Sequence, residues 1–172
     1  SRPPRATRRP PRAPDTFPPD PSTFGFAGLR RVGEPEGPAA QRARSAHGWH
    51  HTGDIGYLDD DGYLFIVDRA KDMIISGGFN VYSSEVEQAV LAHPDVRDCA
   101  VVGLPDDHWG ERVVAVVQPV EGRTPDPDEV VAFVKARIGS LKAPKQVEVW
   151  TDLPRSTVGK VLKTDIKATL RG

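Results

Sequence analysis

The sequence changes character at residue 46, and this change limits how much of the chain can fold. Residues 1–46 hold ten of the 17 prolines, nine arginines, no lysine and four acidic residues, a net charge of +5. Proline fixes φ and removes a hydrogen-bond donor, and the few apolar residues here are too irregular to bury a face. We therefore expect residues 1–46 to be disordered, so a folded core must come from about 126 residues.

The rest of the chain has the size of one small domain. Residues 47–172 carry 14 basic and 20 acidic residues, a net charge of −6. The single cysteine, Cys99, excludes an intrachain disulfide framework and a zinc site built from several cysteines. No apolar run approaches 18 residues and no apolar leader follows Ser1. We therefore expect no transmembrane segment, no secretory signal and a cytoplasmic location.

The first part of this region has the pattern of a β-hairpin. Aromatic and aliphatic runs at 55–58 and 63–67 flank Asp59-Asp60-Asp61-Gly62, and Asp-Gly between such runs is typical of a tight turn. A charged break follows, and residues 73–75 predict a short strand that ends at Ser76-Gly77-Gly78.

Helical and strand patterns then alternate. Apolar residues at helical spacing begin after Ser84, and Ser84 with Glu87 predicts a capping box. Strands are predicted at 96–104, 112–120 and 146–150, a helix opens at 125–128, and a last short helix covers 163–170. The sequence therefore predicts an α+β fold: a small open β-sheet with two or three flanking helices, preceded by a β-hairpin and a disordered Pro/Arg-rich N-terminal tail.

Several polar residues have a pattern that suits ligand binding, and each also has a plain structural interpretation. Lys160 follows Gly159 in a loop, which suits a phosphate, although the spacing of a P-loop fails and a solvated turn explains it equally. Asp54 after Gly53 suits a vicinal diol such as a ribose, or an ordinary turn. Arg69 and Lys71 flank the end of the hairpin, where a solvated strand end is the alternative.

Other residues are better explained by structure. Gly77 and Gly78 permit a positive φ or the close approach of another molecule, or form a simple loop. His47, His50 and His51 have no partner at a recognised metal-ligand spacing, so we expect no metal site. We expect Cys99 to be a buried structural thiol and Trp109 to pack over a loop.

Three motifs in a fixed order now carry a resemblance to a known superfamily. They are HTGDIGYLDDDGYLFIVDRAKDMIISGGFNVYSSEVE, GLPDDHWGERVVAVV and LPRSTVGKVLK. Together they resemble the C-terminal part of AMP-forming acyl-CoA synthetases, the ANL adenylating-enzyme superfamily, and within it most of all the bacterial fatty-acyl-CoA ligases. The resemblance covers residues 47–172. It implies a remnant hairpin of a large adenylating domain plus a hinge at 47–71, and a C-terminal lid domain at 72–172.

The resemblance implies a two-step reaction. A carboxylate reacts with ATP, accompanied by Mg²⁺, to give an acyl-adenylate, and coenzyme A then displaces AMP. The small domain swings between two poses on the large one, presenting a different face for each step. Lys160 matches the catalytic lysine of the adenylation step, which would bridge the substrate carboxylate and the α-phosphate.

The resemblance assigns the other candidate residues as well. Asp54 and Arg69 match the nucleotide-binding positions, with Asp54 on the ribose hydroxyls. Lys71 falls at the hinge position, beside Asp72, and a few residues are enough to absorb such a rotation. Gly77 and Gly78 match the loop that lines the pantetheine tunnel of coenzyme A.

The chain also departs from the family pattern. Ser83 stands where the family usually has proline, which leaves the predicted helix cap at Ser84. The Ser/Thr/Gly-rich phosphate-binding loop and the Tyr-Gly-x-Thr-Glu motif of the large domain do not occur in the sequence. We therefore expect these 172 residues alone to be inactive and to bind no cofactor by themselves, with the large N-terminal domain as the partner.

Three alternatives follow. The chain is the lid of an acyl-CoA synthetase, encoded separately, truncated or frame-disrupted. Alternatively it is a non-catalytic module that complements or regulates a separate adenylating core. The third possibility, nucleic-acid binding by the Arg-rich segment, predicts a steep salt dependence, but no base-reading or stacking element is visible, so we expect no nucleic-acid partner.

Overall fold

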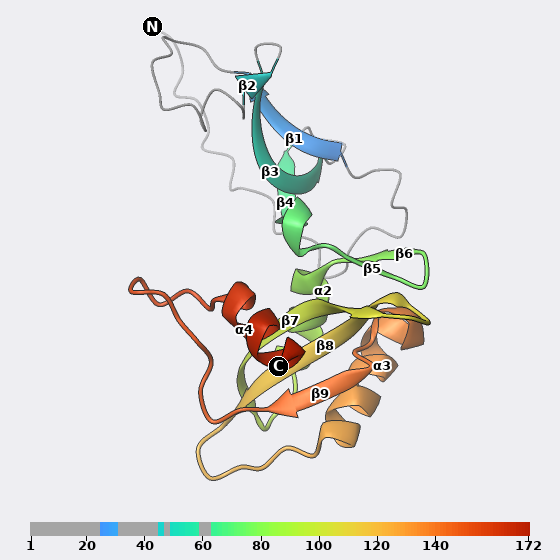
Figure 1. The fold of residues 1–172 in the computed structure, drawn as a ribbon, viewed down its shortest axis with the longest axis vertical. Coiled ribbons are helices and arrows are strands. Elements are labelled where there is room, and N and C mark those ends of the chain that lie inside the picture. Colours follow the sequence, from blue (N-terminus) through green and yellow to red (C-terminus); the bar gives the residue numbers. More distant parts are fainter. Residues whose placement is uncertain (1–24, 31–44, 47–48, 59–62) are drawn as a thin grey trace, which may run out of the picture.

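The computed structural model describes residues 25–30, 45–46, 49–58 and 63–172, which form two sheets and three helices (Figure 1). Among these residues, every helix is too short or too polar to cross a membrane. The elements in chain order are β1 (Gly25–Arg30), β2 (Ser45–Ala46), β3 (Trp49–Leu58), β4 (Leu64–Arg69), the 3-10 turn η2 (Ala70–Asp72), β5 (Ile74–Ser76), β6 (Phe79–Val81), α2 (Ser83–Leu91), β7 (Val96–Asp106), β8 (Gly110–Pro119), α3 (Pro127–Lys142), β9 (Gln146–Val149) and α4 (Lys163–Arg171).

The first sheet is built around β3. This strand pairs antiparallel with β1, β2 and β4. Tyr57 lies opposite Phe65, and their rings stack with centroids 5.3 Å apart. The predicted hairpin is therefore confirmed, although its turn at 59–62 lies outside the described residues. Strands β1 and β2 fall within residues 1–46, for which the composition predicts disorder, and the rest of that segment lies outside the described residues.

The second sheet is built around β8. It pairs antiparallel with β7 along its whole length, parallel with β9, and through Gly110 with Ser76 of β5, which in turn pairs with β6. The sheet is mixed and open, and helices cover both of its faces (Figure 1). The predicted α+β class is confirmed, with three helices in the described part of the chain.

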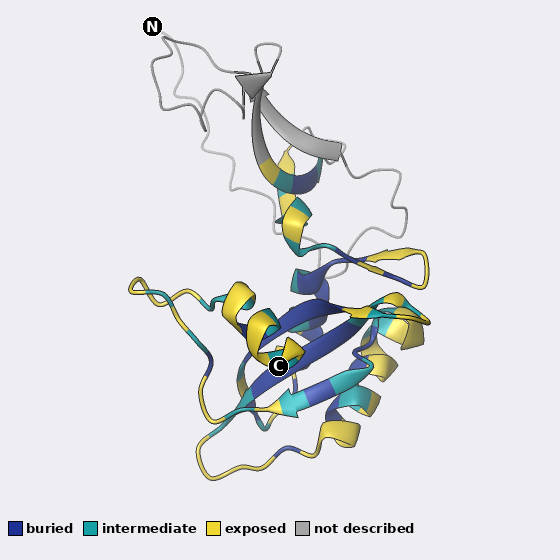
Figure 2. Cartoon of the chain, in the orientation of Figure 1, coloured by how far each residue is buried: buried dark blue, intermediate teal, exposed yellow. Residues whose placement is uncertain are grey.

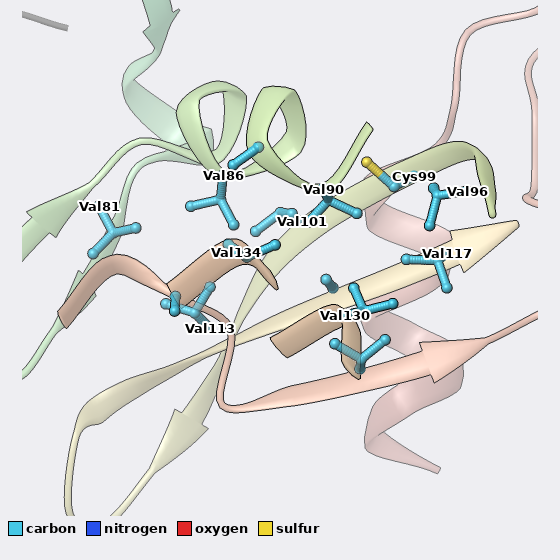
Figure 3. Packing of buried hydrophobic residues seen from close by; sticks show 14 of the residues in the cluster. Val81, Val86, Val90, Val96, Cys99, Val101, Val113, Val117, Val130 and Val134 are labelled. Carbon is cyan, nitrogen blue, oxygen red and sulfur yellow. The ribbon is translucent and has the colours of Figure 1, made fainter. Parts of the chain in front are cut away.

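Both faces of this sheet are buried, because alternate residues of β7 and β8 point to opposite sides. On one face, α2 and α3 pack over Val101, Val113 and Val117 (Figure 3). On the other face, α4 and the loop before it cover Val102, Val114 and Val116. Figure 2 shows the two strands as the most buried part of the molecule. Near-continuous valine in β8 is the sequence signature of a strand covered on both sides.

Helix α2 corrects one prediction. The helix begins at Ser83, with Tyr82 as its N-cap residue, and no side chain of its own caps it. The Ser84 hydroxyl donates instead to the carbonyl of Val67 at 2.6 Å, and the Glu87 carboxylate accepts from the Val101 amide at 2.8 Å. The predicted capping box is therefore wrong, because contacts to neighbouring strands take both side chains.

Candidate functional site

Asp54 and Arg69 face each other across the β3–β4 hairpin. They are register partners in the antiparallel pair, and the Arg69 Nε lies 3.4 Å from the Asp54 Oδ1. Asp54 lies within β3, directly after Gly53, which has a φ of 77°. Its side chain is 25% exposed and that of Arg69 is 60% exposed, so an acceptor and a donor are presented side by side.

A single turn joins this hairpin to the second sheet. Strand β4 ends at Arg69, the 3-10 turn η2 spans Ala70–Asp72, and the chain is extended again at Met73 with a φ of −65° and a ψ of 134°. Lys71 is exposed within this turn and Asp72 is half-buried. The two predicted hinge residues therefore lie on the only covalent connection between the described parts of the two sheets.

Lys160 lies on a folded loop, which we call the Lys160 loop and define as residues 155–161. Arg155 and Val161 form an isolated antiparallel bridge, the Ser156 amide donates to the Lys160 carbonyl at 2.8 Å, and the Gly159 amide donates to the Ser156 carbonyl at 2.8 Å. Gly159 has a φ of 81°, which an L-residue adopts with difficulty. The lysine is exposed at the end of this turn.

A hollow of about 390 Å³ brings the hinge and the Lys160 loop together. Its lining consists of Arg69, Lys71, Asp72, Lys160, Val161, Leu162, Lys163, Thr164 and Lys167. Five of these side chains are basic and one is acidic. Among the described residues, Lys160 is paired with no carboxylate. The hollow therefore suits a ligand with several negative charges, and it joins Arg69, Lys71 and Lys160 in one site.

Gly77 and Gly78 lie apart from the lining of this hollow. They form the two-residue turn between β5 and β6, with Ser76 opposite Phe79. Their φ values are 58° and 80°, and a tight hairpin turn with two positive φ angles favours glycine. A Cβ on Gly77 would lie 3.1 Å from the Trp109 ring, whereas a Cβ on Gly78 would meet nothing within 4 Å. The geometry of the turn therefore explains both glycines without a ligand.

The sequence did not reveal the polar contacts around Lys163. Its Nζ lies 2.8 Å from the Glu87 Oε1 and 2.7 Å from the Ser83 Oγ. Burial raises the pKa of Glu87, and the neighbouring Lys163 opposes that rise. Helix periodicity does place Glu87 and Lys163 on their helices, but a contact over such a sequence separation leaves no local signal.

The remaining predictions concern metal and thiol chemistry. The described residues contain no group of three or more histidine, cysteine or acidic side chains that could hold a metal ion. Cys99 is buried, its Sγ lies 3.6 Å from the Glu87 carbonyl, and burial raises the pKa of the thiol strongly. Cys99 is thus a structural thiol, as the sequence predicts.

Trp109 is half-buried, and the Lys145 Nζ lies over its ring, 4.8 Å from the ring centroid.

Comparison with known proteins finds a matching family model and similar proteins. Residues 85–160 match the family described as the AMP-binding enzyme C-terminal domain. The chain is 48% identical over 120 residues to a feruloyl-CoA synthase of Amycolatopsis, covering 70% of this chain and 24% of the relative. It is 44% identical over 130 residues to the long-chain-fatty-acid–CoA ligase FadD13 of Mycobacterium tuberculosis, covering 76% of this chain and 26% of the relative.

Solved structures agree. ATP-bound MatB from Rhodopseudomonas palustris superposes with a TM-score of 0.72 at 38% identity, covering 78% of this chain and 27% of that one. Apo MatB covers the same shares at 39% identity with a TM-score of 0.61. The match of residues 85–160 to the AMP-binding enzyme C-terminal domain, together with these relatives, confirms the resemblance to the C-terminal part of the acyl-CoA synthetases. The chain spans about a quarter of the length of these relatives.

Proposed function

We propose that this chain is the mobile lid of an AMP-forming acyl-CoA synthetase, together with the hairpin and hinge on which the lid turns. The single observation that supports this most directly is the hollow that gathers Arg69, Lys71 and Lys160. A nucleotide phosphate bound there would meet cations from the hairpin, the connector and the Lys160 loop at once. The pairing of Asp54 with Arg69 would place a ribose acceptor on the same hairpin.

In the first step, a carboxylate oxygen of the substrate bonds to the α-phosphorus of ATP, and the bond to the β-phosphate breaks to release pyrophosphate. Lys160 would hold the carboxylate and the α-phosphate in line and stabilise the charge that develops between them. In the second step, the thiolate of coenzyme A bonds to the acyl carbon and AMP leaves. Gly77 and Gly78 would then line the path of the pantetheine arm, where a turn without side chains leaves space.

Magnesium would enter with ATP as part of the substrate. The described residues offer no cluster that could hold the ion themselves, so its ligands would be the phosphates and the large domain.

For the acyl group, we propose a medium- or long-chain fatty acid. The similarity to FadD13, a long-chain-fatty-acid–CoA ligase, supports this choice. The similarity to a feruloyl-CoA synthase supports an aromatic acid as the alternative substrate.

We further propose that the 172 residues are inactive alone. The phosphate-binding loop and the Tyr-Gly-x-Thr-Glu motif are absent from the sequence, and the relatives are about four times longer than the matched region. The same surface would serve the alternative function, in which the chain docks on a separate adenylating core. Co-purification with a core that lacks its own lid, together with restored turnover, would support docking.

One graft tests the proposal. Residues 49–172 would replace the matched quarter of FadD13, and ATP–pyrophosphate exchange and thioester formation would be measured with a panel of fatty and aromatic acids. We expect the graft to be active and Lys160→Ala to lower pyrophosphate exchange by about 100-fold or more. Thioester formation from a preformed acyl-adenylate should persist in that variant. Equal exchange by the graft and Lys160→Ala, or robust exchange by the 172-residue chain alone, would contradict the proposal.

A further inference from the structure

The β3–β4 hairpin is joined to the domain of the second sheet by hydrogen bonds as well as by the covalent connector. The Asp68 Oδ2 accepts from the Ser83 hydroxyl at 2.9 Å and from the Ser84 amide at 3.2 Å. Asp68 therefore lies at the N-terminal end of α2, where free amides and the helix dipole favour a carboxylate. With the bond from Ser84 to Val67, three hydrogen bonds join β4 to the start of α2 across the connector.

These contacts continue to α4 through Ser83. The Ser83 hydroxyl accepts from the Lys163 Nζ at 2.7 Å while it donates to Asp68, and Lys163 also pairs with Glu87. We call Asp68, Ser83, Glu87 and Lys163 the hinge cluster. Ser83 is 0% exposed, and charge-assisted hydrogen bonds are stronger where water is excluded. One hydroxyl thus links β4, α2 and α4.

Ser83 is the first residue of α2, a position where proline is well tolerated because its missing N–H has no intrahelical partner. Proline has no hydroxyl, so it could neither donate to Asp68 nor accept from Lys163. The helix therefore does not need serine here, whereas the link between the hairpin and α4 does.

The link lies beside the connector between the two sheets. The connector is one 3-10 turn, and Lys163 follows Lys160 by three residues at the start of α4. The described arrangement superposes better on ATP-bound MatB than on apo MatB, with TM-scores of 0.72 and 0.61 over the same share of the chain. The two comparisons therefore differ in overall agreement with this chain.

We propose that Ser83 is a positioning residue that holds α4 and the Lys160 loop against the hairpin carrying Arg69. Through the hinge cluster it favours this arrangement of lid and hairpin over others that the connector allows. The linking atom is the Ser83 hydroxyl, which contacts both Asp68 and Lys163. Its consequence for the reaction rests on the proposed function, but its effect on the arrangement does not.

A distance measurement on the full 172-residue chain tests the arrangement directly. Spin labels would be placed at Leu64→Cys on β4 and Ala168→Cys on α4, both exposed, in a Cys99→Ala background. Double electron–electron resonance should give one narrow distance for the chain with Ser83. Ser83→Ala should raise the share of other distances about tenfold, because it removes two hydrogen bonds, each to a charged group. Asp68→Asn should shift the distribution in the same direction.

Two further variants keep the test decisive. Ser83→Pro preserves the start of the helix while removing the hydroxyl, so it should reproduce the effect of Ser83→Ala even if the alanine variant folds poorly. Ser140→Ala removes an exposed hydroxyl from α3 and should leave the distribution unchanged. Identical distributions for the parent, Ser83→Ala and Ser83→Pro would overturn the proposal.

The effect of Ser83 on the reaction is measured separately, in the FadD13 graft. Ser83→Pro should change the ratio of the adenylation rate to the rate of thioester formation from a preformed acyl-adenylate, because only the balance of arrangements is altered. An inactive graft would count against the proposed function and would leave the spin-label result standing. An active graft in which both rates are unchanged, with unchanged distances, would refute Ser83 as a positioning residue.

Discussion

The Arg155 guanidinium forms an ion pair with the Asp98 carboxylate of β7. The same guanidinium donates from its second nitrogen to the carbonyl of Gly159 at 3.1 Å. One side chain therefore fastens the Lys160 loop at its start to the sheet and holds the residue before Lys160. An exposed lysine on a turn would otherwise sample many positions, so we regard Arg155 as the residue that limits where Lys160 can reach.

We predict that Arg155→Ala lowers adenylation by about tenfold in the graft, because a small displacement of a positioned group is costly. Thioester formation from a preformed acyl-adenylate should change by less than about twofold, since the proposed function assigns Lys160 to the first step. Arg123→Ala is the matched control, because Arg123 makes a comparable surface pair with Asp95 away from the loop. Equal losses in both half-reactions would assign Arg155 to stability instead.

Helix α4 is held to the sheet chiefly by Ile166, its one buried residue. We predict that Ile166→Ala lowers the free energy of unfolding of the chain by about 2–5 kcal/mol, the range for a large-to-small change in a packed core. Val158→Ala is the control: Val158 is 78% exposed on the Lys160 loop, and its truncation should cost about 0.5 kcal/mol or less. Urea denaturation of both variants checks this, and equal midpoints would show that α4 is not packed as described.

Substitutions of the two glycines in the β5–β6 turn can distinguish a structural role from a functional one. Both have positive φ, so alanine is strained at each, but only at Gly77 does a Cβ approach Trp109. We predict that Gly77→Ala destabilises the chain by about 1 kcal/mol more than Gly78→Ala. If these residues also line the coenzyme A path, Gly78→Ala should slow thioester formation in the graft while adenylation persists. Unchanged kinetics for Gly78→Ala would leave the turn with its structural role alone.

Local patterns in the sequence predicted the fold well because each is decided by neighbours in the chain. The apolar runs that flank the Asp-Gly turn signal, the near-continuous valine of Val113 to Val117 and the helix start at 125–128 all act within a few residues. The structure has the hairpin strands, β8 and α3 where these patterns place them. Strands β1, β2 and β6 are exceptions. Strand β6 was not predicted, because three residues after a Gly-Gly turn carry too little pattern to distinguish a strand from a loop.

The site could be predicted only where a motif carries it. Lys160, Asp54 and Arg69 stand out through motif order, and the structure places Arg69 and Lys160 on one hollow. The capping-box prediction failed because the rule sees only Ser84 and Glu87, whereas Val67, Val101 and Lys163 compete for their side chains. Ser83 and Arg155 act through Asp68 and Asp98, residues distant in sequence, and such pairings appear only once the chain is folded.

The turn between β7 and β8 gives a prediction about acid stability. The Asp106 Oδ1 accepts from the amides of Trp109 and His108, both at 3.0 Å, and these bonds hold the pKa of Asp106 below its usual value. A carboxyl whose pKa is lowered by folding stabilises the folded state above its unfolded pKa, about 3.9. As the pH falls below that value, the unfolded state takes up the proton first, so this contribution is lost.

We therefore predict that Asp106→Asn flattens the loss of stability on the acid side while keeping the turn, because the asparagine Oδ1 can still accept both amides. The measurement is the free energy of unfolding from urea titrations between about pH 5 and pH 2.5, a window that spans the usual pKa of Asp. Asp107→Asn removes an exposed neighbouring carboxylate and should leave the slope close to that of the parent. If the free energy of unfolding falls equally with pH in the parent and in Asp106→Asn, the carboxylate charge does not stabilise the turn.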